Sequence, residues 1–301
     1  MANEIKKSML SIIICTYNRE KFLKMCLKSI PTLTTEKKLY EIIVVNNNCT
    51  DSTNELCQNF AQEHPNILFK QVLETNQGLG FARNRGITEA KGDIISFIDD
   101  DAEVTPQFVD SIINAFKQYP KYNAMGGRVL PVFEGGKEPK WLNKYLIGPI
   151  SKVDYGKTTR KFPKKYPAGC NMIFRREIFE KYGNFKGELS RSDDKDMFLR
   201  LKKHHEKVLY AADVIVYHHI PADRMNAESI INIGYSNGKF EAKRLAKEGK
   251  KQKISKMIEL MLKFVAAIII GCFYFICFKP EKGRVLIAYM YKMLLGYMKF
   301  P

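Results

Sequence analysis

Three consecutive aspartates, Asp99, Asp100 and Asp101, directly follow the apolar run at residues 94–98. Adjacent carboxylates repel one another unless a cation neutralises them. Hard oxygen ligands suit Mg²⁺ or Mn²⁺, and either ion in turn suits a diphosphate. We interpret the run as a candidate metal site at the carboxyl end of a strand. A solvated acidic turn that caps the next helix is the alternative.

A second acidic cluster contains Asp193, Asp194 and Asp196 and opens a segment with helical spacing of apolar residues. Carboxylates in the first turn of a helix are favoured by its dipole, so capping alone would explain the cluster. The functional alternative is a general base that accepts a proton from an attacking hydroxyl group. Asp196 has the features of a structural first-turn acid rather than of a catalyst.

Other candidates are basic. His218 and His219 end a predicted strand, and only one of two adjacent strand residues can face an aspartate-based metal site. Arg83 follows two glycines at the start of a predicted helix, where it could pair with a phosphate or stack on a base. Arg85 is more typical of a surface charge. The glycine pattern is an incomplete dinucleotide fingerprint, and the sequence contains no Walker A motif.

Strands and helices alternate through the first half of the chain, which predicts a doubly wound α/β sheet that binds ligands at the carboxyl ends of its strands. Thr105 is predicted to cap a helix in which Pro106 is the first residue. The predicted strands are residues 9–15, 41–45, 67–73 and 94–98, and the predicted helices cover 22–30, 82–90 and 106–116, with one more from about residue 52.

The second half is less regular. A Gly-, Pro- and Lys-rich stretch runs from residue 126 to about 167, and after residue 238 the composition becomes basic and then apolar. The predicted elements are a strand at 170–174, a helix at 194–204, a strand at 208–217, and two apolar tail segments at 264–278 and 285–300.

Several ordered motifs together resemble the family 2 glycosyltransferases with the GT-A fold, over about residues 9–240. The motifs are SIIICTYNR at 11–19, EIIVVNNNCTD at 41–51, NQGLGFARNRG at 76–86, FIDDD at 97–101, GCNM at 169–172, DDKD at 193–196 with LRL at 199–201, and His218. The resemblance implies a nucleotide-sugar half at about 1–125 and an acceptor half at about 126–240. The composition of residues 241–301 separately predicts basic, apolar membrane-associating helices, and a buried helix pair packed on the catalytic domain is the alternative.

The resemblance also implies site residues on the donor side. The residues expected beside the nucleotide are Thr16, Tyr17, Arg19, Asn46, Asn47, Arg83, Asp99 and Asp100. Asn46 and Asn47 stand where family members, which usually prefer uracil, carry aspartate; an amide donates as well as accepts hydrogen bonds, unlike a carboxylate. Asp101, with Asp99 and His218, is expected to hold Mg²⁺ or Mn²⁺ against the diphosphate.

On the acceptor side, the resemblance makes Asp194 the base and Asp193 the neighbour that orients the acceptor, although this chain reads Asp-Asp where the family commonly reads Glu-Asp. The implied activity is an inverting transfer of the hexosyltransferase type from a nucleotide-diphosphate sugar, with UDP favoured. The acceptor would be a hydroxyl group of a glycan or lipid-linked molecule in bacterial surface polysaccharide synthesis. A nucleotidyltransferase is the nearest enzymatic alternative, and it would not require a base at Asp194.

Composition narrows the partners. The formal net charge of +17 attracts anionic lipid, nucleic acid or phosphorylated small molecules. The lysines gather near the apolar tail and no RRM, KH or helix-turn-helix signature appears, which argues against a nucleic-acid-binding module. We therefore expect an anionic membrane surface as partner and no nucleic acid. Seven cysteines without CxxC spacing and the lack of an apolar leader favour the cytoplasmic face of the membrane.

Overall fold

The computed structural model describes residues 9–163, 166–189, 192–246 and 248–299. The chain divides into two compact units. One, which we call the sheet unit, comprises Met1–Leu130, Val153–Glu188 and Asp193–His218, and the other, the helical unit, comprises Pro131–Lys152, Leu189–Ser192 and His219–Pro301. The boundary expected near residue 240 falls inside a helix, α7 (Ala227–Arg244).

The sheet has the strand order β3-β2-β1-β4-β8-β6-β9-β5 across the described residues, and β7 pairs with β9. The first four strands in this order are parallel, and the pairs that β4 and β6 make with β8 are antiparallel. The strands are β1 (Leu10–Thr16), β2 (Tyr40–Asn46), β3 (Leu68–Leu73), β4 (Ile94–Asp99), β5 (Ala102–Val104), β6 (Ala124–Phe133), β7 (Arg160–Lys161), β8 (Met172–Arg175) and β9 (Val208–Ile220).

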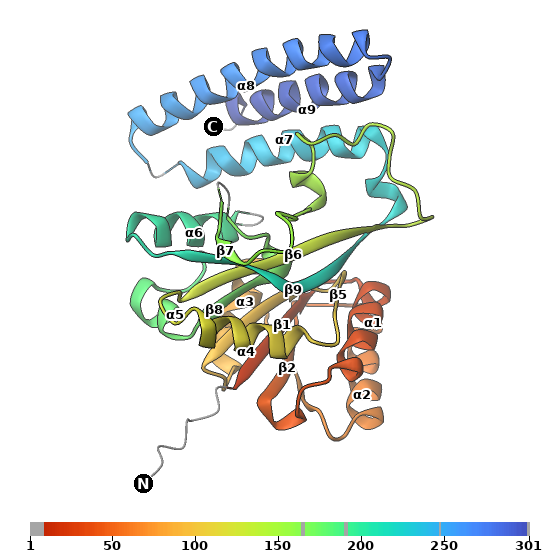
Figure 1. Cartoon of the computed structure of the whole chain (residues 1–301), viewed down its shortest axis with the longest axis vertical. Coiled ribbons are helices and arrows are strands. Elements are labelled where there is room, and N and C mark those ends of the chain that lie inside the picture. The colour runs from red at the N-terminus through yellow and green to blue at the C-terminus, as the bar shows by residue number, and fades with distance from the viewer. Residues whose placement is uncertain (1–8, 164–165, 190–191, 247, 300–301) are drawn as a thin grey trace. The chain divides into compact units, whose positions relative to one another are not determined.

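Helices cover both faces of the sheet (Figure 1). Alternation along β1 places Ile12 and Ile14 in one apolar cluster and Ile13 in the other, which explains why the strand reads as continuously apolar. The first cluster includes residues of α1 (Glu20–Ser29), α2 (Thr53–Glu63) and α4 (Phe108–Gln118). The second includes residues of α3 (Leu79–Glu89), α5 (Glu177–Tyr182) and α6 (Asp193–Lys203). Short 3-10 turns also occur: η1 (Ile30–Thr32), η2 (Lys37–Leu39), η3 (Gly148–Ile150), η4 (Gly169–Asn171) and η5 (Ala222–Arg224).

The prediction that Thr105 caps α4 is wrong. The helix begins at Phe108 and its N-cap residue is Gln107. Thr105 instead continues toward β9, because its N–H donates to the carbonyl of Ile215 over 3.4 Å. Its own carbonyl accepts from the Phe108 N–H at 2.9 Å, which makes a turn ahead of the helix.

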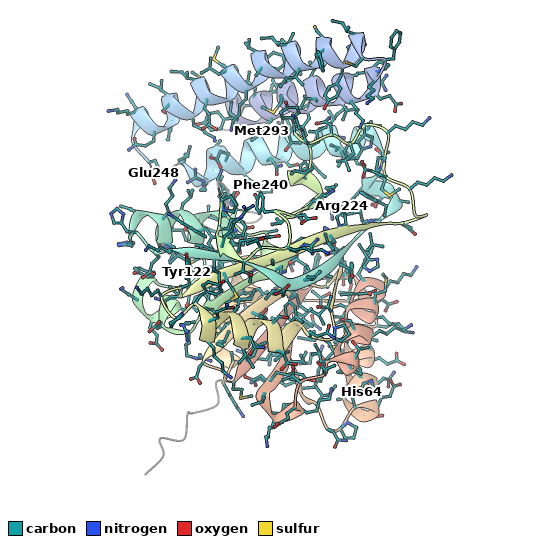
Figure 2. The ribbon with its side chains drawn as sticks, in the orientation of Figure 1. His64, Tyr122, Arg224, Phe240, Glu248 and Met293 are labelled. Carbon is teal, nitrogen blue, oxygen red and sulfur yellow. The ribbon has the colours of Figure 1, made fainter. Side chains whose placement is uncertain are left out.

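The helical unit contains α7, α8 (Lys250–Ile276) and α9 (Pro280–Met298). Helix α9 packs along both α7 and α8, and Met293 marks it in Figure 2. Glycine permits the close approach: a Cβ on Gly238 would collide with the carbonyl of Met293, and one on Gly283 would lie 2.7 Å from the carbonyl oxygen of Gly271. Helix α7 was not predicted, because its buried positions include Gly234, Gly238 and Glu241, which carry no apolar periodicity.

Candidate active site

Parallel pairing brings the carboxyl ends of β1, β2 and β4 to one edge of the sheet. Thr16 pairs in register with Asn46, and Cys15 pairs with Asp99. Residues that lie far apart in the sequence, Thr16, Asn46 and Asp99, therefore meet where a doubly wound sheet binds its ligand. The aspartate run at the end of β4, from which the sequence predicts a site, lies at this edge.

Arg19 binds two of the three consecutive aspartates. Its Nη1 lies 2.6 Å from Asp100 Oδ1, and its Nη2 lies 2.8 Å from Asp101 Oδ2. Asp100 also accepts a hydrogen bond from the Thr16 hydroxyl over 2.9 Å. The Arg19 guanidinium stacks over the ring of Phe22, with its carbon 4.5 Å from the ring centroid. Part of the repulsion in the run is thus offset by a cation from the chain itself.

His218 contacts the last aspartate of the run. Its Nε2 lies 3.2 Å from Asp101 Oδ1, and both side chains are 3% exposed. Antiparallel pairing of β5 with β9 sets this contact, because Ala102 stands opposite His218. Burial alone would raise the pKa of Asp101, but the hydrogen bond and charge of His218, followed by Arg19, hold that pKa well below its ordinary value. His219 is half-buried.

Asp99 has a different ion-pair partner, Arg83. Its side chain is 34% exposed, and its Oδ1 is 3.6 Å from Arg83 Nη2. Burial raises the pKa of Asp99, and the charge of Arg83 opposes that rise. Within the described ranges, no three His, Cys, Asp or Glu side chains lie close enough to hold a metal ion together. Asp101 and His218 are in contact, and the described residues contain no three-ligand group that would add Asp99 to them.

Amide side chains line a pocket beside this edge. Its volume is about 530 Å³, and its lining residues are Asn46, Asn48, Cys49, Thr50, Asn54, Gln71, Val72 and Leu73. Asn54 Oδ1 accepts from both Asn46 Nδ2, at 2.8 Å, and Gln71 Nε2, at 2.6 Å. Tyr17 is half-exposed at the end of β1, where a flat apolar ligand could stack on it.

The two predicted asparagines differ in role. Asn47 is buried and does not line the pocket. Its Nδ2 donates to the carbonyls of Glu74 and Asn76, and its Oδ1 accepts from the Gly78 N–H at 2.8 Å. Asn47 thus holds the loop that leads into α3, and Asn46 contributes to the pocket wall.

Arg83 is buried between the two acidic clusters. Its Nη1 lies 2.6 Å from Asp193 Oδ2, and the two side chains are 3% and 1% exposed. Burial disfavours the charge on Arg83, but Asp193 and then Asp99 and Asp194 raise its pKa above the ordinary value. The arginine is therefore a permanent cation. It pairs with the second cluster and lies near the first.

Asp194 differs from its neighbour Asp193, which is fully buried. The Asp194 side chain is partly exposed, and its Oδ1 accepts a hydrogen bond from the Lys195 N–H over 2.6 Å. Burial raises the pKa of Asp194 to about 6, against the charge of Arg83. A carboxylate with this pKa is ionised at neutral pH and is a stronger base than an ordinary aspartate.

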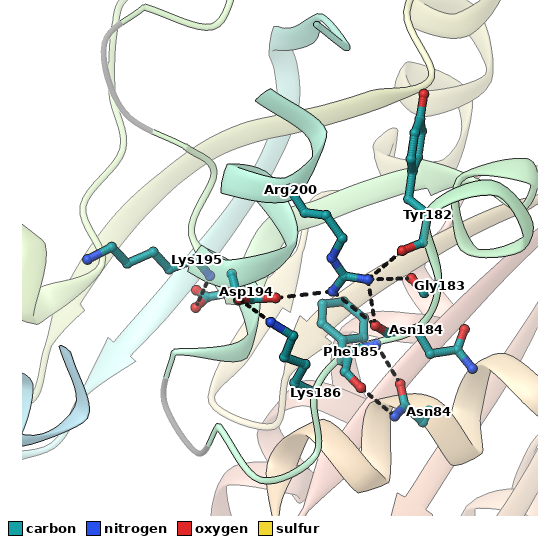
Figure 3. Close-up of polar contacts among 10 residues, drawn as sticks. Asn84, Tyr182, Gly183, Asn184, Phe185, Lys186, Asp194, Lys195 and Arg200 are labelled. Carbon is teal, nitrogen blue, oxygen red and sulfur yellow. Dashed lines mark hydrogen bonds and ion pairs between the residues drawn. The ribbon is translucent and has the colours of Figure 1, made fainter. Parts of the chain in front are cut away.

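Asp196 points to a different set of partners, as predicted for a structural acid. It pairs with Lys186 at 3.0 Å and with Arg200 at 3.2 Å. Arg200 also donates to the carbonyls of Tyr182, Gly183 and Asn184, which secures the loop between α5 and α6 (Figure 3).

Gly169 was not singled out in the sequence, although it begins the GCNM motif. A Cβ at this position would lie 2.7 Å from Arg83 Nη2 and 3.3 Å from Asp194 Oδ2. Only a glycine leaves both side chains in place. Its place at the start of the GCNM motif, just before a predicted short strand, was the sequence signal that could have identified Gly169.

The order of parallel and antiparallel strands, with helices on both faces of the sheet, is that of the GT-A fold. The mannosyltransferase PcManGT from Pyrobaculum calidifontis, solved with GDP-Man and Mn²⁺, is similar over 98% of this chain and 88% of its own, with a TM-score of 0.67 and 18% identity. GalNAc-T7, solved with UDP, GalNAc and Mn²⁺, is similar over 77% of this chain and 48% of its own, with a TM-score of 0.58 and 16% identity.

The profile described as "Glycosyl transferase family 2" matches residues 11–183, more than half of the chain. The protein belongs to this family and is a glycosyltransferase, as predicted. Glycosyltransferase AglE of Haloferax volcanii is 26% identical over 69% of this chain and 66% of its own length. A GalNAc(5)-diNAcBac-PP-undecaprenol beta-1,3-glucosyltransferase of Campylobacter jejuni is 30% identical over 48% and 47%. The matched segments span 16% to 66% of the first curated relatives.

Proposed function

We propose that this enzyme transfers a hexose from a nucleoside diphosphate sugar, with inversion, to a hydroxyl group of a glycan or lipid-linked acceptor in bacterial surface polysaccharide synthesis. The observation that carries the proposal is the pair of acidic clusters on either side of Arg83, with the partly exposed Asp194 beside it. Similar proteins support the classes of donor and acceptor: two structural neighbours bind GDP-Man and UDP, and one relative is named for an undecaprenol-linked substrate.

Each group of site residues has a proposed role in donor binding or in sugar transfer. The amides of the pocket at the ends of β2 and β3 would bind the base of the nucleotide, and Tyr17 would stack on it. Asp194 would accept the proton of the acceptor hydroxyl as the oxygen attacks the anomeric carbon. A single displacement from that side inverts the anomeric centre, because the diphosphate leaves from the opposite face of the sugar.

A divalent ion fits the donor side. Mg²⁺ and similar ions are commonly held by one or two protein ligands together with phosphate oxygens. Asp101 and His218 provide one oxygen and one nitrogen 3.2 Å apart, at the edge that receives the diphosphate. A bound ion would neutralise charge on the departing diphosphate. Asp99 would contact the ribose or a water on the ion, as the resemblance implies.

A thermal-shift screen tests donor binding. UDP-sugars are screened first and GDP-sugars second, each with and without Mn²⁺. We expect stabilisation that requires the ion and disappears in EDTA. Full binding and turnover in EDTA would remove the metal from the mechanism. Turnover that transfers a nucleotide instead of a sugar would overturn the reaction class.

We further propose that the helical unit attaches the enzyme to the cytoplasmic face of an anionic membrane. Helix α8 is long and apolar enough to cross a membrane, and 17% of its most apolar window is buried. Lys250, Lys251 and Lys253 lie in its first turn, where each could add about 1 kcal/mol against anionic lipid. The large apolar side chains exposed on α8 and just after it are Ile254, Ile258, Met261, Leu262, Val265, Ile268, Ile269, Phe273, Phe275, Ile276 and Phe278.

The packing of the helical unit favours a helix that lies in the membrane surface rather than across it. Buried Glu241 of α7 pairs with Arg244 and with Lys256 of α8, so the two helices are joined at this end. At the other end, Gly271 of α8 contacts Gly283 of α9. A crossing α8 would place the basic residues Lys279, Lys282 and Arg284 on the far side of the bilayer, against the preference of basic residues for the cytoplasmic side.

Flotation with liposomes tests this attachment. Binding should require anionic lipid at low salt, and Leu262→Ser with Ile269→Ser and Phe273→Ser should abolish the salt-resistant part. Leu68→Ser with Leu73→Ser, equally exposed on β3, is the matched control and should leave flotation unchanged. Trypsin added outside the vesicles should cut after Lys282 or Arg284, at the start of α9. Protection of these sites would indicate a crossing helix, and no flotation would exclude attachment.

A further inference from the structure

The Arg83 side chain is too deeply buried to contact a nucleotide directly. The side chain is 3% exposed and is held by a 2.6 Å ion pair with Asp193, at 3.6 Å from Asp99 and with its guanidinium carbon 5.6 Å from the ring centroid of Phe185. A guanidinium that contacts a ligand must present at least one N–H to solvent in the ligand-free state or move on binding. Because Arg83 is only 3% exposed, contact with a nucleotide would require it to move, and that movement would leave Asp193 buried without its cation, which is strongly unfavourable.

The neighbours of Arg83 fix α3 against the segment that leads into α6. Asn84 Nδ2 donates to the carbonyl of Phe185 over 2.8 Å, and Asn84 Oδ1 accepts from the Phe185 N–H over 3.0 Å (Figure 3). A Cβ on Gly80 would lie 2.9 Å from the Cα of Gly187, so the backbones touch there. The ion pair from Arg83 to Asp193 continues this attachment into the first turn of α6.

We propose that Arg83 is a positioning residue that acts through Asp193: it ties the first turn of α6 to the end of β4 and thereby sets where the Asp194 carboxylate stands. The inference rests on the proposed role of Asp194 as the base. It replaces the expectation that Arg83 completes the nucleotide pocket. Donor binding would then be independent of Arg83, and transfer would depend on it.

The charges around Asp194 give this role a signature of its own. Burial raises the pKa of Asp194, Arg83 lowers it, Asp193 raises it, the Lys195 N–H lowers it and Asp99 raises it. Arg83→Gln removes a nearby cation and should move the Asp194 titration to higher pH. Asp193→Asn removes a nearby anion and should move the same titration to lower pH. Opposite shifts from the two ends of one ion pair are not produced by a general loss of stability.

The experiment uses the full chain with aspartate ¹³C-labelled at the side-chain carboxyl, and Asp194→Asn assigns the signal. The pH titration of Asp194 is measured by NMR in the wild type, Arg83→Gln and Asp193→Asn. UDP and GDP binding with Mn²⁺ is measured by calorimetry in the same proteins. Arg85→Gln is the matched control, because Arg85 is on the same helix but is 42% exposed and pairs with Glu89.

Opposite shifts in the two variants, with nucleotide affinity within about threefold of wild type, are the expected result. A loss of affinity above about tenfold in Arg83→Gln, whether or not the Asp194 titration moves, would make Arg83 a nucleotide contact and overturn the proposal. Should a single variant not fold, Arg83→Gln with Asp193→Asn leaves no unpaired buried charge. That double variant should keep nucleotide affinity, and its loss there would equally overturn the proposal.

The titration does not depend on turnover, so it separates this inference from the proposed function. If Asp194 shifts as expected but Asp194→Asn retains activity, the positioning is right and the base is another residue. Where turnover is measured, Arg83→Gln should lower it at least about tenfold without a matching rise in donor KM. Equal changes in Arg85→Gln would refute a specific role for Arg83.

Discussion

The two acidic clusters have similar sequences and different surroundings. Asp100 and Asp101 are buried; Arg19 pairs with both, and His218 contacts Asp101. The carboxylates of this cluster therefore interact with positively charged groups. In the second cluster, Asp193 takes up the cation of Arg83, and Asp194 keeps a partly exposed carboxylate with a raised pKa. The partners supplied by other elements, rather than the run of aspartates itself, distinguish the proposed diphosphate site from the proposed base.

The largest expected effect is on the first cluster. Asp101→Asn removes the charge that lies between Arg19 and His218, so ion-dependent nucleotide binding and turnover should both fall to background. Calorimetry of UDP with and without Mn²⁺ measures the binding, and the unfolding temperature checks the fold. Retained Mn²⁺-dependent binding in a folded variant would assign the ion to other residues.

The second cluster should respond differently. Asp194→Asn keeps the shape of the side chain but cannot take up a proton, so turnover should fall by about 10²- to 10⁴-fold with nucleotide affinity unchanged. A loss of both turnover and nucleotide affinity in Asp194→Asn would contradict the different roles proposed for the two clusters. A loss of less than about tenfold would transfer the role of base elsewhere, with Asp193 as the next candidate.

The pH dependence of turnover sharpens the same contrast. A general base works when deprotonated, and the pKa of Asp194 is about 6 in the free enzyme. Turnover divided by KM should therefore rise as pH increases through about 6 and level off above it. The rise should be missing from the residual activity of Asp194→Asn. An unchanged rise in that variant would attribute it to another group.

The smallest effect should come from Asp196, two residues from the proposed base. Asp196→Asn removes ion pairs with Lys186 and Arg200 at the protein surface, so unfolding free energy should fall by about 0.2–1 kcal/mol. Turnover should stay near that of the wild type. Denaturant unfolding measures the first quantity, and a loss of turnover as large as that of Asp194→Asn would show that the whole first turn of α6 is catalytic.

Much of the sheet unit is predictable from the sequence, because buried parallel strands read as apolar runs and the strand ends carry the polar motifs. The start of α4 was misplaced, since the pairing of Thr105 with β9 is not a local signal. Helix α7 was missed because glycines occupy its packed face. Close contact between helices selects small residues, and these carry no hydrophobic pattern.

The sequence by itself determined the family, the α/β order, the acidic clusters and the apolar tail, since each is a local pattern. Only the tertiary structure decided which partner each charge has. Arg19 contacts Asp100 across 81 positions of sequence, and Arg83 contacts Asp193 across 110 positions. His218 contacts Asp101 although the two residues lie on different strands or turns far apart in the sequence. An ionised side chain takes its pKa and its role from the charges within a few ångströms of it, and folding, not sequence proximity, sets those distances.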